Sequence, residues 1–361
     1  TGKTIFMGCL ADIDEAIELF QKAQSSSAQP LAAGDSWNNG DAQKWLKFAY
    51  LLKARWLNHL SKKAEGSWQD GKYDTQAILD CLAKAQQSNA DNTVIRHTDT
   101  NGNTHDVLGW NETVDYSTVY SCVGMNSNYY VSKTYFENLT NFDGKGIEDP
   151  RADKIIAWRQ FNVNGVKTWI RGKGVDMSTD IRMPNGMSNF IARKADGSGW
   201  EPSIESRAGD SIYVGTYAGS VGVYGTASVI YDRGTVGWGQ SSGNVFIRPN
   251  SPYLWATYSE AQFIKAEVLF KKGDKAGAFQ AYKNGIKASI DEINKMLTTW
   301  TGSPYDECPS FGQMDQAKID AFMNGAIGTA ADITMEKIMT QKFIAMLYST
   351  QNWNDMRRHD Y

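Results

Sequence analysis

The chain has 361 residues, of which 41% are hydrophobic and 21% charged, a balance typical of a folded protein with a sizeable core. Its formal net charge of −3 leaves no excess of Lys and Arg, which argues against binding along the phosphates of a nucleic acid. No apolar run approaches the ~18 residues that a membrane-spanning helix needs.

The N-terminal zone, residues 1–90, is predicted to be helical. Its first helix is expected over residues 12–24, where apolar side chains recur on one face and Asp12 and Glu15 have the spacing of a capping box. Two more helices are expected over residues 41–63, capped by Asp41, and over residues 74–88. The longer one carries an apolar stripe of Trp45, Phe48, Leu52, Trp56 and Leu60.

The middle zone, residues 91–250, is rich in Gly, Asn, Ser, Thr and aromatic residues. Asn-Gly pairs at residues 101–102 and 164–165 lie between β-prone flanks, a pattern that predicts two β-hairpins. Residues 213–234 alternate Gly with aromatic and β-branched residues and are too rich in Gly for a helix. We interpret this zone as a long, loop-rich insertion, a kind of segment that commonly carries binding sites on a rigid scaffold.

The C-terminal zone, residues 251–361, is predicted to be helical again. Helices are expected over residues 258–273, 274–297 and 332–349, with a short helix around residues 313–324.

Small and medium-sized residues recur at matching offsets in the predicted helices. The triplets are Ala16, Phe20 and Ala23; Ala77, Cys81 and Lys84; and Ala278, Tyr282 and Gly285. This spacing lets antiparallel helices approach closely, as in tetratricopeptide-type hairpins, although any amphipathic hairpin could show it by chance. The predicted fold is mainly α: a tetratricopeptide-like helical-hairpin scaffold with a long loop-rich insertion that contains short β-hairpins, in one domain over residues 1–361.

No catalytic constellation is recognisable in the sequence. The four histidines lie outside any HExxH pattern, no serine lies in a GxSxG elbow, and the TGKT and GKGVD segments lack the context of a phosphate-binding loop. A glycosidase pair of carboxylates stays open as an alternative, because such pairs converge only in the fold. We therefore expect a protein that is not an enzyme, with no catalytic residues and no cofactor.

Metal sites are not expected either. Asp99, Asn101 and Asn103 alternate like the first ligands of a calcium loop, but the glycine is misplaced and no bidentate Glu follows, so the predicted hairpin turn explains them better. The four cysteines are scattered, without the spacing of a zinc site. Cys9 and Cys81 lie on apolar helix faces, where a buried free thiol is the common situation.

Aromatic residues are in excess, with 12 Trp and 17 Tyr. A sugar is bound when its apolar C–H face stacks on an aromatic ring while Asp, Asn or Arg side chains bond its hydroxyls. Each ring taken singly is more often a packing residue, but the insertion combines many of them with such polar neighbours. The predicted glycan-binding residues are Trp200, Tyr224, Tyr231, Asp232, Arg233, Trp238 and Asn244.

Six stretches, in order along nearly the whole chain, carry a resemblance to a known family. They are DIDEAIELF near the start, GDAQKWLKFAYLLKARW (40–56), EDPR (148–151), YVGTYAG (213–219), SPYLWATYSEAQFIKAEVLFKKGD (251–274) and TMEKIMTQKFIAML…QNWNDMRR (334–358). In these stretches the sequence resembles the SusD/RagB (SusD-like) proteins of Bacteroidetes, which are glycan-binding lipoproteins of the cell surface.

The resemblance implies a helical scaffold with a loop-rich ligand face that binds oligosaccharide or polysaccharide without cleaving it. It also implies delivery of the glycan to a SusC-like TonB-dependent transporter at the outer membrane, where an N-terminal lipid anchor, absent from this chain, holds the protein at the surface. By this comparison the chain is expected to be truncated at both ends. The alternative function is a helical-repeat protein–protein adaptor, and no nucleic-acid partner is expected.

The last predicted helix is followed by NWNDMRRHDY at residues 352–361. Asp355 and Arg358 lie three residues apart and are expected to pair across one helical turn. Arg357 or Arg358 is expected to bond the carbonyls that end the preceding helix. A clamp for an anionic ligand is the alternative role of these charges.

Overall fold

The computed structural model divides the chain into two compact units. Unit 1 comprises residues 1–95, 253–292 and 327–361, and unit 2 comprises residues 96–252 and 293–326. Unit 1 therefore unites helices from both terminal zones of the sequence. The structure describes residues 2–22, 32, 34–35, 37–95, 131–156, 158–163, 166–171, 190–193, 200–201, 212–214, 245–246, 252–298, 309 and 312–359.

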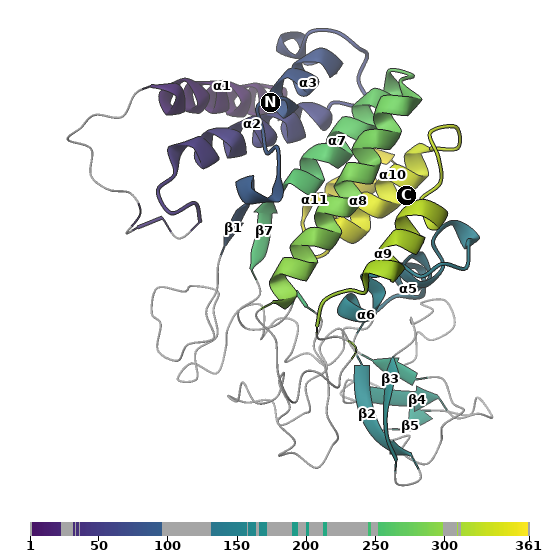
Figure 1. The fold of residues 1–361 in the computed structure, drawn as a ribbon. Helices are drawn as coiled ribbons and strands as arrows, with labels where there is room; N and C mark the ends of the chain where they lie inside the picture. The colour runs from purple at the N-terminus through teal and green to yellow at the C-terminus, as the bar shows by residue number, and fades with distance from the viewer. Residues whose placement is uncertain are drawn as a thin grey trace. The chain divides into compact units, whose positions relative to one another are not determined.

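Unit 1 is built mainly from helices (Figure 1). Their bounds are Gly2–Gln21 for α1, Ala42–Asn58 for α2, Thr75–Leu82 for α3, Tyr258–Lys271 for α7, Lys275–Leu297 for α8, Met335–Ala345 for α10 and Gln351–His359 for α11. The last five residues of α8 belong to unit 2. Strands β1 (Thr93–Ile95) and β7 (Tyr253–Ala256) form a two-stranded antiparallel sheet. None of the helices that the structure describes combines the length and the apolar character needed to cross a membrane.

Helix α1 begins at Gly2, well before the predicted start at residue 12. Phe6, Met7 and Leu10 extend its apolar face and pack in the core of unit 1, which makes this first part of the chain helical too. Asp12 and Glu15 consequently lie inside the helix, and the predicted capping box is wrong.

Helices α2 and α3 begin where the sequence predicts. Asp41 accepts hydrogen bonds from two backbone N–H groups in the first turn of α2, and Asp74 accepts one in the first turn of α3. Both helices end earlier than predicted, at Asn58 and at Leu82, and turns follow them.

Helices α7 and α8 form a hairpin and lie side by side in Figure 1. The turn contains Gly273 at φ 82°, a left-handed conformation that favours glycine. A Cβ atom at Gly285 would lie 3.0 Å from the ring of Phe263, so a side chain there would require that ring to shift by a few tenths of an ångström. The predicted close approach of antiparallel helices is confirmed for this pair, in which Ala278 and Tyr282 are fully buried.

Unit 2 contains shorter elements. Its helices are α5 (Lys133–Thr140), α6 (Ala152–Ile155) and α9 (Gln316–Ala321), and α9 runs into a π-helical turn at Phe322–Ala326. Strand β2 (Trp158–Val163) pairs with β3 (Val166–Arg171), and β4 (Phe190–Arg193) lies between β5 (Trp200–Glu201) and β6 (Ile212–Val214). The mainly α fold with a hairpin-containing insertion is thus confirmed.

One of the two predicted hairpins is present. Val163 pairs with Val166, so residues 164–165 form a two-residue connection, as the Asn-Gly pair predicts. The other predicted hairpin, at residues 101–102, lies outside the described residues, as does the alternative calcium loop.

Ion pairs hold the helical part of unit 2 together. Asp149 and Arg151 are both completely buried, and the guanidinium of Arg151 binds the carboxylate of Asp149 at 2.6 and 2.9 Å. Arg171, at the end of β3, binds Glu148 at 2.6 Å and Asp153 at 2.7 Å. The β2–β3 hairpin is therefore fastened at its base to the segment around α6.

Candidate functional site

Five aromatic residues of unit 1 form a contiguous group, called the aromatic cluster below: Trp37, Trp45, Phe48, Tyr253 and Trp255. The indole rings of Trp37 and Trp255 stack, with centroids 5.0 Å apart and planes inclined by 30°. Trp45 lies 5.8 Å from Trp37 and 5.5 Å from Phe48, and Tyr253 meets Trp255 edge-on at 5.9 Å. These separations fall in the range of favourable aromatic contacts, so the rings support one another.

Local structure brings these rings to one place. Trp45 and Phe48 are three residues apart on α2 and share one face of that helix. Tyr253 and Trp255 are two residues apart on β7 and share one face of the strand. The pairing of β1 with β7 skips Trp255, which is therefore the extra residue of a β-bulge, an irregularity that redirects a side chain.

Asp35 fixes the loop that carries Trp37. Its carboxylate accepts hydrogen bonds from the indole N–H of Trp45 (2.8 Å) and from the backbone N–H groups of Trp37 (3.0 Å), Asn38 (3.0 Å) and Gly40 (2.8 Å). Partial burial raises the pKa of Asp35, but these hydrogen bonds together outweigh burial and hold the pKa below its ordinary value. One ionised carboxylate thus ties two indole-bearing segments to a single point.

We expect the variant Asp35→Asn to loosen this arrangement. Its NH₂ group would face two N–H donors whichever oxygen it replaced, because Oδ1 accepts from Trp37 and Asn38 and Oδ2 accepts from Gly40 and Trp45. Such mispairing costs about 1–3 kcal/mol of unfolding free energy, measurable by urea denaturation. Asp41→Asn is a matched control, since Asn caps a helix as well as Asp does. Equal stability of the two variants would contradict this role of Asp35.

The aromatic cluster lies at the surface of unit 1. Trp255 is 37% exposed, and the other four residues are partly exposed. Phe48 links the cluster to the apolar core, which is formed by α1, α2, α3 and α7. Partly exposed aromatic side chains of this kind suit stacking against the C–H face of a sugar.

The cluster offers binding groups and no evident reactive group. Its carboxylate, Asp35, is already occupied by four donors. In the part of the chain that the structure describes, no group of three or more His, Cys, Asp and Glu side chains is placed to hold a metal ion. The chemistry that these residues support is therefore recognition of a ligand with apolar faces.

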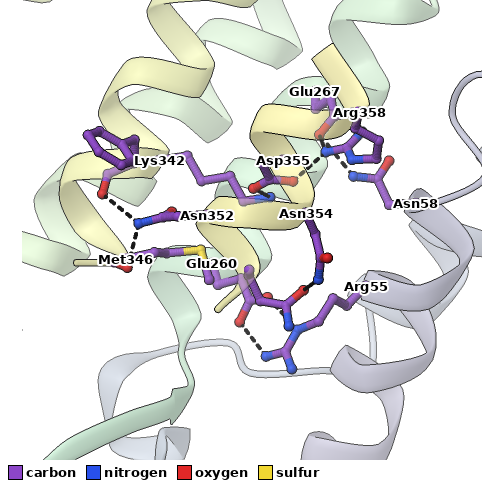
Figure 2. Close-up of polar contacts among 12 residues, drawn as sticks. Arg55, Asn58, Glu260, Glu267, Lys342, Met346, Asn352, Asn354, Asp355 and Arg358 are labelled. Carbon is purple, nitrogen blue, oxygen red and sulfur yellow. Dashed lines mark hydrogen bonds and ion pairs between the residues drawn. The ribbon is translucent and has the colours of Figure 1, made fainter. Parts of the chain in front are cut away.

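A buried ion pair joins α2 to α7 next to the cluster (Figure 2). The guanidinium of Arg55 binds both carboxylate oxygens of Glu260, with Nε–Oε1 at 2.6 Å and Nη2–Oε2 at 2.7 Å. The same Nη2 donates to the backbone carbonyl of Trp255 at 2.9 Å.

A second buried network fastens α11 (Figure 2). Both carboxylate oxygens of Glu267, which is completely buried, accept hydrogen bonds from Arg358, and Oε2 also accepts one from Asn58 at 2.9 Å. Arg358 donates to Asp355 at 2.7 Å, and Asp355 binds Lys342 at 2.7 Å. Burial raises the pKa of Glu267, but Arg358, together with His359 and Lys342, outweighs burial and holds that pKa well below the ordinary value.

This network decides the role of the C-terminal charges. The predicted pairing of Asp355 with Arg358 is confirmed at 2.7 Å. Arg358 does not make the predicted contact with the end of the preceding helix, because its guanidinium binds the carboxylates of Glu267 and Asp355. The amide of Asn352 donates instead to the carbonyls of Phe343 at 3.3 Å and Met346 at 2.9 Å.

His59 gives unit 1 a pH dependence. Burial, assisted by the positive charges of Arg358 and Lys342, lowers its pKa from 6.5 to about 4. Between these values the unfolded chain binds more protons than the folded chain, so stability falls as the pH is lowered from 6.5 toward 4. The variant His59→Gln should reduce this slope in denaturant unfolding measured at a series of pH values. An unchanged slope would show that other titrating groups cause the pH dependence of stability.

A SusD-like family model, described as "Starch-binding associating with outer membrane", matches residues 1–361. The chain belongs to the SusD-like family. The resemblance seen in the sequence is thereby confirmed, whereas no curated protein sequence matches the chain.

Solved structures show the SusD-like fold over the whole chain. A SusD/RagB family protein of Bacteroides thetaiotaomicron has 19% identity and a TM-score of 0.60, and the match covers 100% of this chain and 61% of that one. A Bacteroidetes AC2a SusD-like protein has 17% identity and a TM-score of 0.57, with 99% and 66% covered. A chitin-binding protein has 18% identity and a TM-score of 0.58, with 99% and 60% covered. This SusD-like chain thus spans less than two thirds of the length of these structures.

The glycan-binding residues predicted from the sequence lie in the insertion of this SusD-like chain. Trp200 begins β5, where it pairs with Arg193 of β4. The others lie outside the described residues: Tyr224, Tyr231, Asp232, Arg233, Trp238 and Asn244. All seven residues stay predictions.

The aromatic cluster of this SusD-like chain does not follow from its sequence pattern. The pattern places Trp45 and Phe48 in an apolar stripe and indicates no role for Trp37 or Trp255. The available signal was the position of the tryptophans beside turn and cap residues, in WNNGD (37–41) and in YLWAT (253–257).

Proposed function

We propose that this SusD-like protein binds a glycan at the cell surface without cleaving it and delivers it to a SusC-like TonB-dependent transporter. The observation that carries the binding step is the aromatic cluster, in which Trp255 is 37% exposed and stacks on Trp37. The family description names starch and one similar structure is a chitin-binding protein, so starch and chitin oligosaccharides are the first ligands to test.

The remaining parts of the proposal come from the family resemblance. An N-terminal lipid anchor would hold the full-length protein at the outer membrane, beside its transporter. The seven predicted residues of the insertion, from Trp200 to Asn244, would add further contacts to the glycan. Polar side chains among them supply the hydroxyl contacts that ring faces alone do not offer.

The variant Trp255→Ala should weaken glycan binding by about five- to tenfold, because one aromatic contact is worth about 1 kcal/mol. Affinity electrophoresis in gels that contain the polysaccharide, followed by calorimetry with oligosaccharides, measures the change. Trp353→Ala is a matched control, since Trp353 is 62% exposed on α11 and lies outside the cluster.

Two results would contradict parts of this proposal. Equal glycan binding by the wild type and by Trp255→Ala would show that the aromatic cluster is not part of the glycan-binding site. Loss of binding in Trp200→Ala or Trp238→Ala would then place the site in the insertion. Release of reducing ends from a bound glycan would overturn the assignment as a non-catalytic protein.

The second candidate function is a protein–protein adaptor, because exposed aromatic residues are also typical of protein interfaces. A pull-down that recovers a barrel transporter through Trp255, together with no binding to any glycan, would favour this function. A transporter complex that forms alongside glycan binding fits the first proposal.

A further inference from the structure

The most exposed ring of the aromatic cluster depends on an unusual backbone position. Trp255 is the extra residue of the β-bulge and has no partner residue on β1. Its carbonyl accepts a hydrogen bond at 2.9 Å from Nη2 of Arg55, a side chain of another element. The side chain of Arg55 therefore holds the backbone at Trp255, as pairing with β1 holds the neighbouring residues of β7.

The guanidinium of Arg55 is held in one orientation. Its Nε and Nη2 bind the two oxygens of Glu260 at 2.6 and 2.7 Å, and the two residues are 7% and 1% exposed. A planar guanidinium that binds a carboxylate in this two-pronged way fixes the direction of its remaining N–H bonds. Figure 2 shows Arg55 reaching from α2 toward Glu260.

Glu260 is itself fixed by the start of α7. Its backbone N–H donates to the hydroxyl of Thr257, which caps the helix, at 3.1 Å. Its carboxylate thus extends from the first turn, where the helix dipole favours a negative charge. The chain of contacts runs from the first turn of α7 through Glu260 and Arg55 to the carbonyl of Trp255.

Arg55 also belongs to the helix that carries two other rings of the cluster. Phe48 and Arg55 are seven residues apart on α2, which is two helical turns along the same face, or about 10 Å. Helix α2 therefore supplies the rings of Trp45 and Phe48. Through Arg55 it also sets how far Trp255 lies from these two rings.

We propose that Arg55, oriented by Glu260, is a positioning residue that places the ring of Trp255 for glycan binding without touching the glycan. This inference rests on the function proposed above and deepens it. The buried ion pair of Arg55 and Glu260 thereby contributes to the affinity for the glycan as well as joining α2 to α7.

The test is the double variant Arg55→Met/Glu260→Leu. Replacing both members of a buried ion pair by apolar residues of similar size is often neutral or stabilising, so the fold should survive while the bond to the Trp255 carbonyl is lost. The single variant Arg55→Lys keeps the charge but lacks the fork that reaches Glu260 and the carbonyl together. Lys47→Met is a control on the same helix, because Lys47 binds Asp91 and not the cluster.

Two readouts separate this inference from the function on which it rests. Circular dichroism of the coupled indoles reports the stacking of Trp37 on Trp255 without any ligand, and affinity for starch or chitin oligosaccharides reports binding. We expect both Arg55 variants to lose the indole signal and to bind about three- to tenfold more weakly, with Lys47→Met unchanged. An unchanged indole signal and unchanged affinity in a folded variant would overturn the inference. If the wild type binds no glycan, the proposed function fails, and the indole signal alone decides whether Arg55 positions Trp255.

Discussion

Replacing Arg358 by Ala should lower the free energy of unfolding of unit 1 by about 3–5 kcal/mol, because removal of one member of a buried ion pair leaves the other charge without compensation. Arg358 is 7% exposed and binds Glu267, which is completely buried, as well as Asp355. Burial lowers the pKa of Arg358, but the carboxylates of Glu267 and Asp355 together outweigh burial and raise that pKa above the ordinary value. Arg358 therefore stays charged, and its removal leaves Glu267 buried without the charge that offsets the cost of burial.

Arg357→Ala is the matched control for this prediction. The neighbouring arginine lies on the exposed side of α11, so its removal changes the same charge and should cost within about 0.5 kcal/mol. Guanidinium unfolding and hydrogen exchange of α10 and α11 measure both variants. The double variant Arg358→Met/Glu267→Leu should recover much of the loss, since the stranded charge is then absent. Similar costs for the two single arginine variants would show that the network adds little to stability.

A loss of similar size, about 3–5 kcal/mol, is expected in unit 2 for the variant Asp149→Asn. Asp149 and Arg151 are completely buried, and the carboxylate accepts three hydrogen bonds, two from the guanidinium and one from the backbone N–H of Arg151. The neutral amide matches the shape of Asp but removes the charge that balances the guanidinium.

Asp143→Asn provides the comparison for this second variant. Asp143 binds Lys145 at 3.9 Å near the surface, where an ion pair contributes little. Its φ of 54° is also one that Asn tolerates. Hydrogen exchange of α5 and α6 reports unit 2 separately from unit 1. Faster exchange in Asp149→Asn than in Asp143→Asn is expected, and equal exchange would count against the importance of the buried pair.

Local rules predicted local structure well in this chain. Asp41 and Asp74 cap the helices that they precede, and the Asn-Gly pair at residues 164–165 joins two paired strands. Each of these features is formed by residues that are close in sequence, so the sequence around them is enough to predict it. The start of α1 was wrong for the same reason, since Asp12 looked like a local cap although the apolar face continued before it.

The candidate site could not be predicted in this way. Trp37 and Trp255 lie on opposite sides of the insertion in the sequence, and only the fold stacks them. The β-bulge that singles out Trp255 leaves no mark in the residues of β7. Glu260 could be recognised as a residue of the first turn of α7, but nothing nearby indicates that its partner is Arg55. Contacts of this kind arise from tertiary packing, which periodicity and capping signals do not contain.

The buried network around Glu267 also has a consequence for biosynthesis. It joins Asn58, Glu267 and Arg358, and the ribosome delivers the first of these long before the other two, with the whole insertion in between. Helices α1, α2 and α3 therefore emerge with apolar faces that have no α7 to cover them, and Glu267 emerges before its guanidinium. Such segments are prone to aggregate until their partners arrive. We therefore expect the N-terminal helices to need protection from aggregation until α7 and α11 can pack with them.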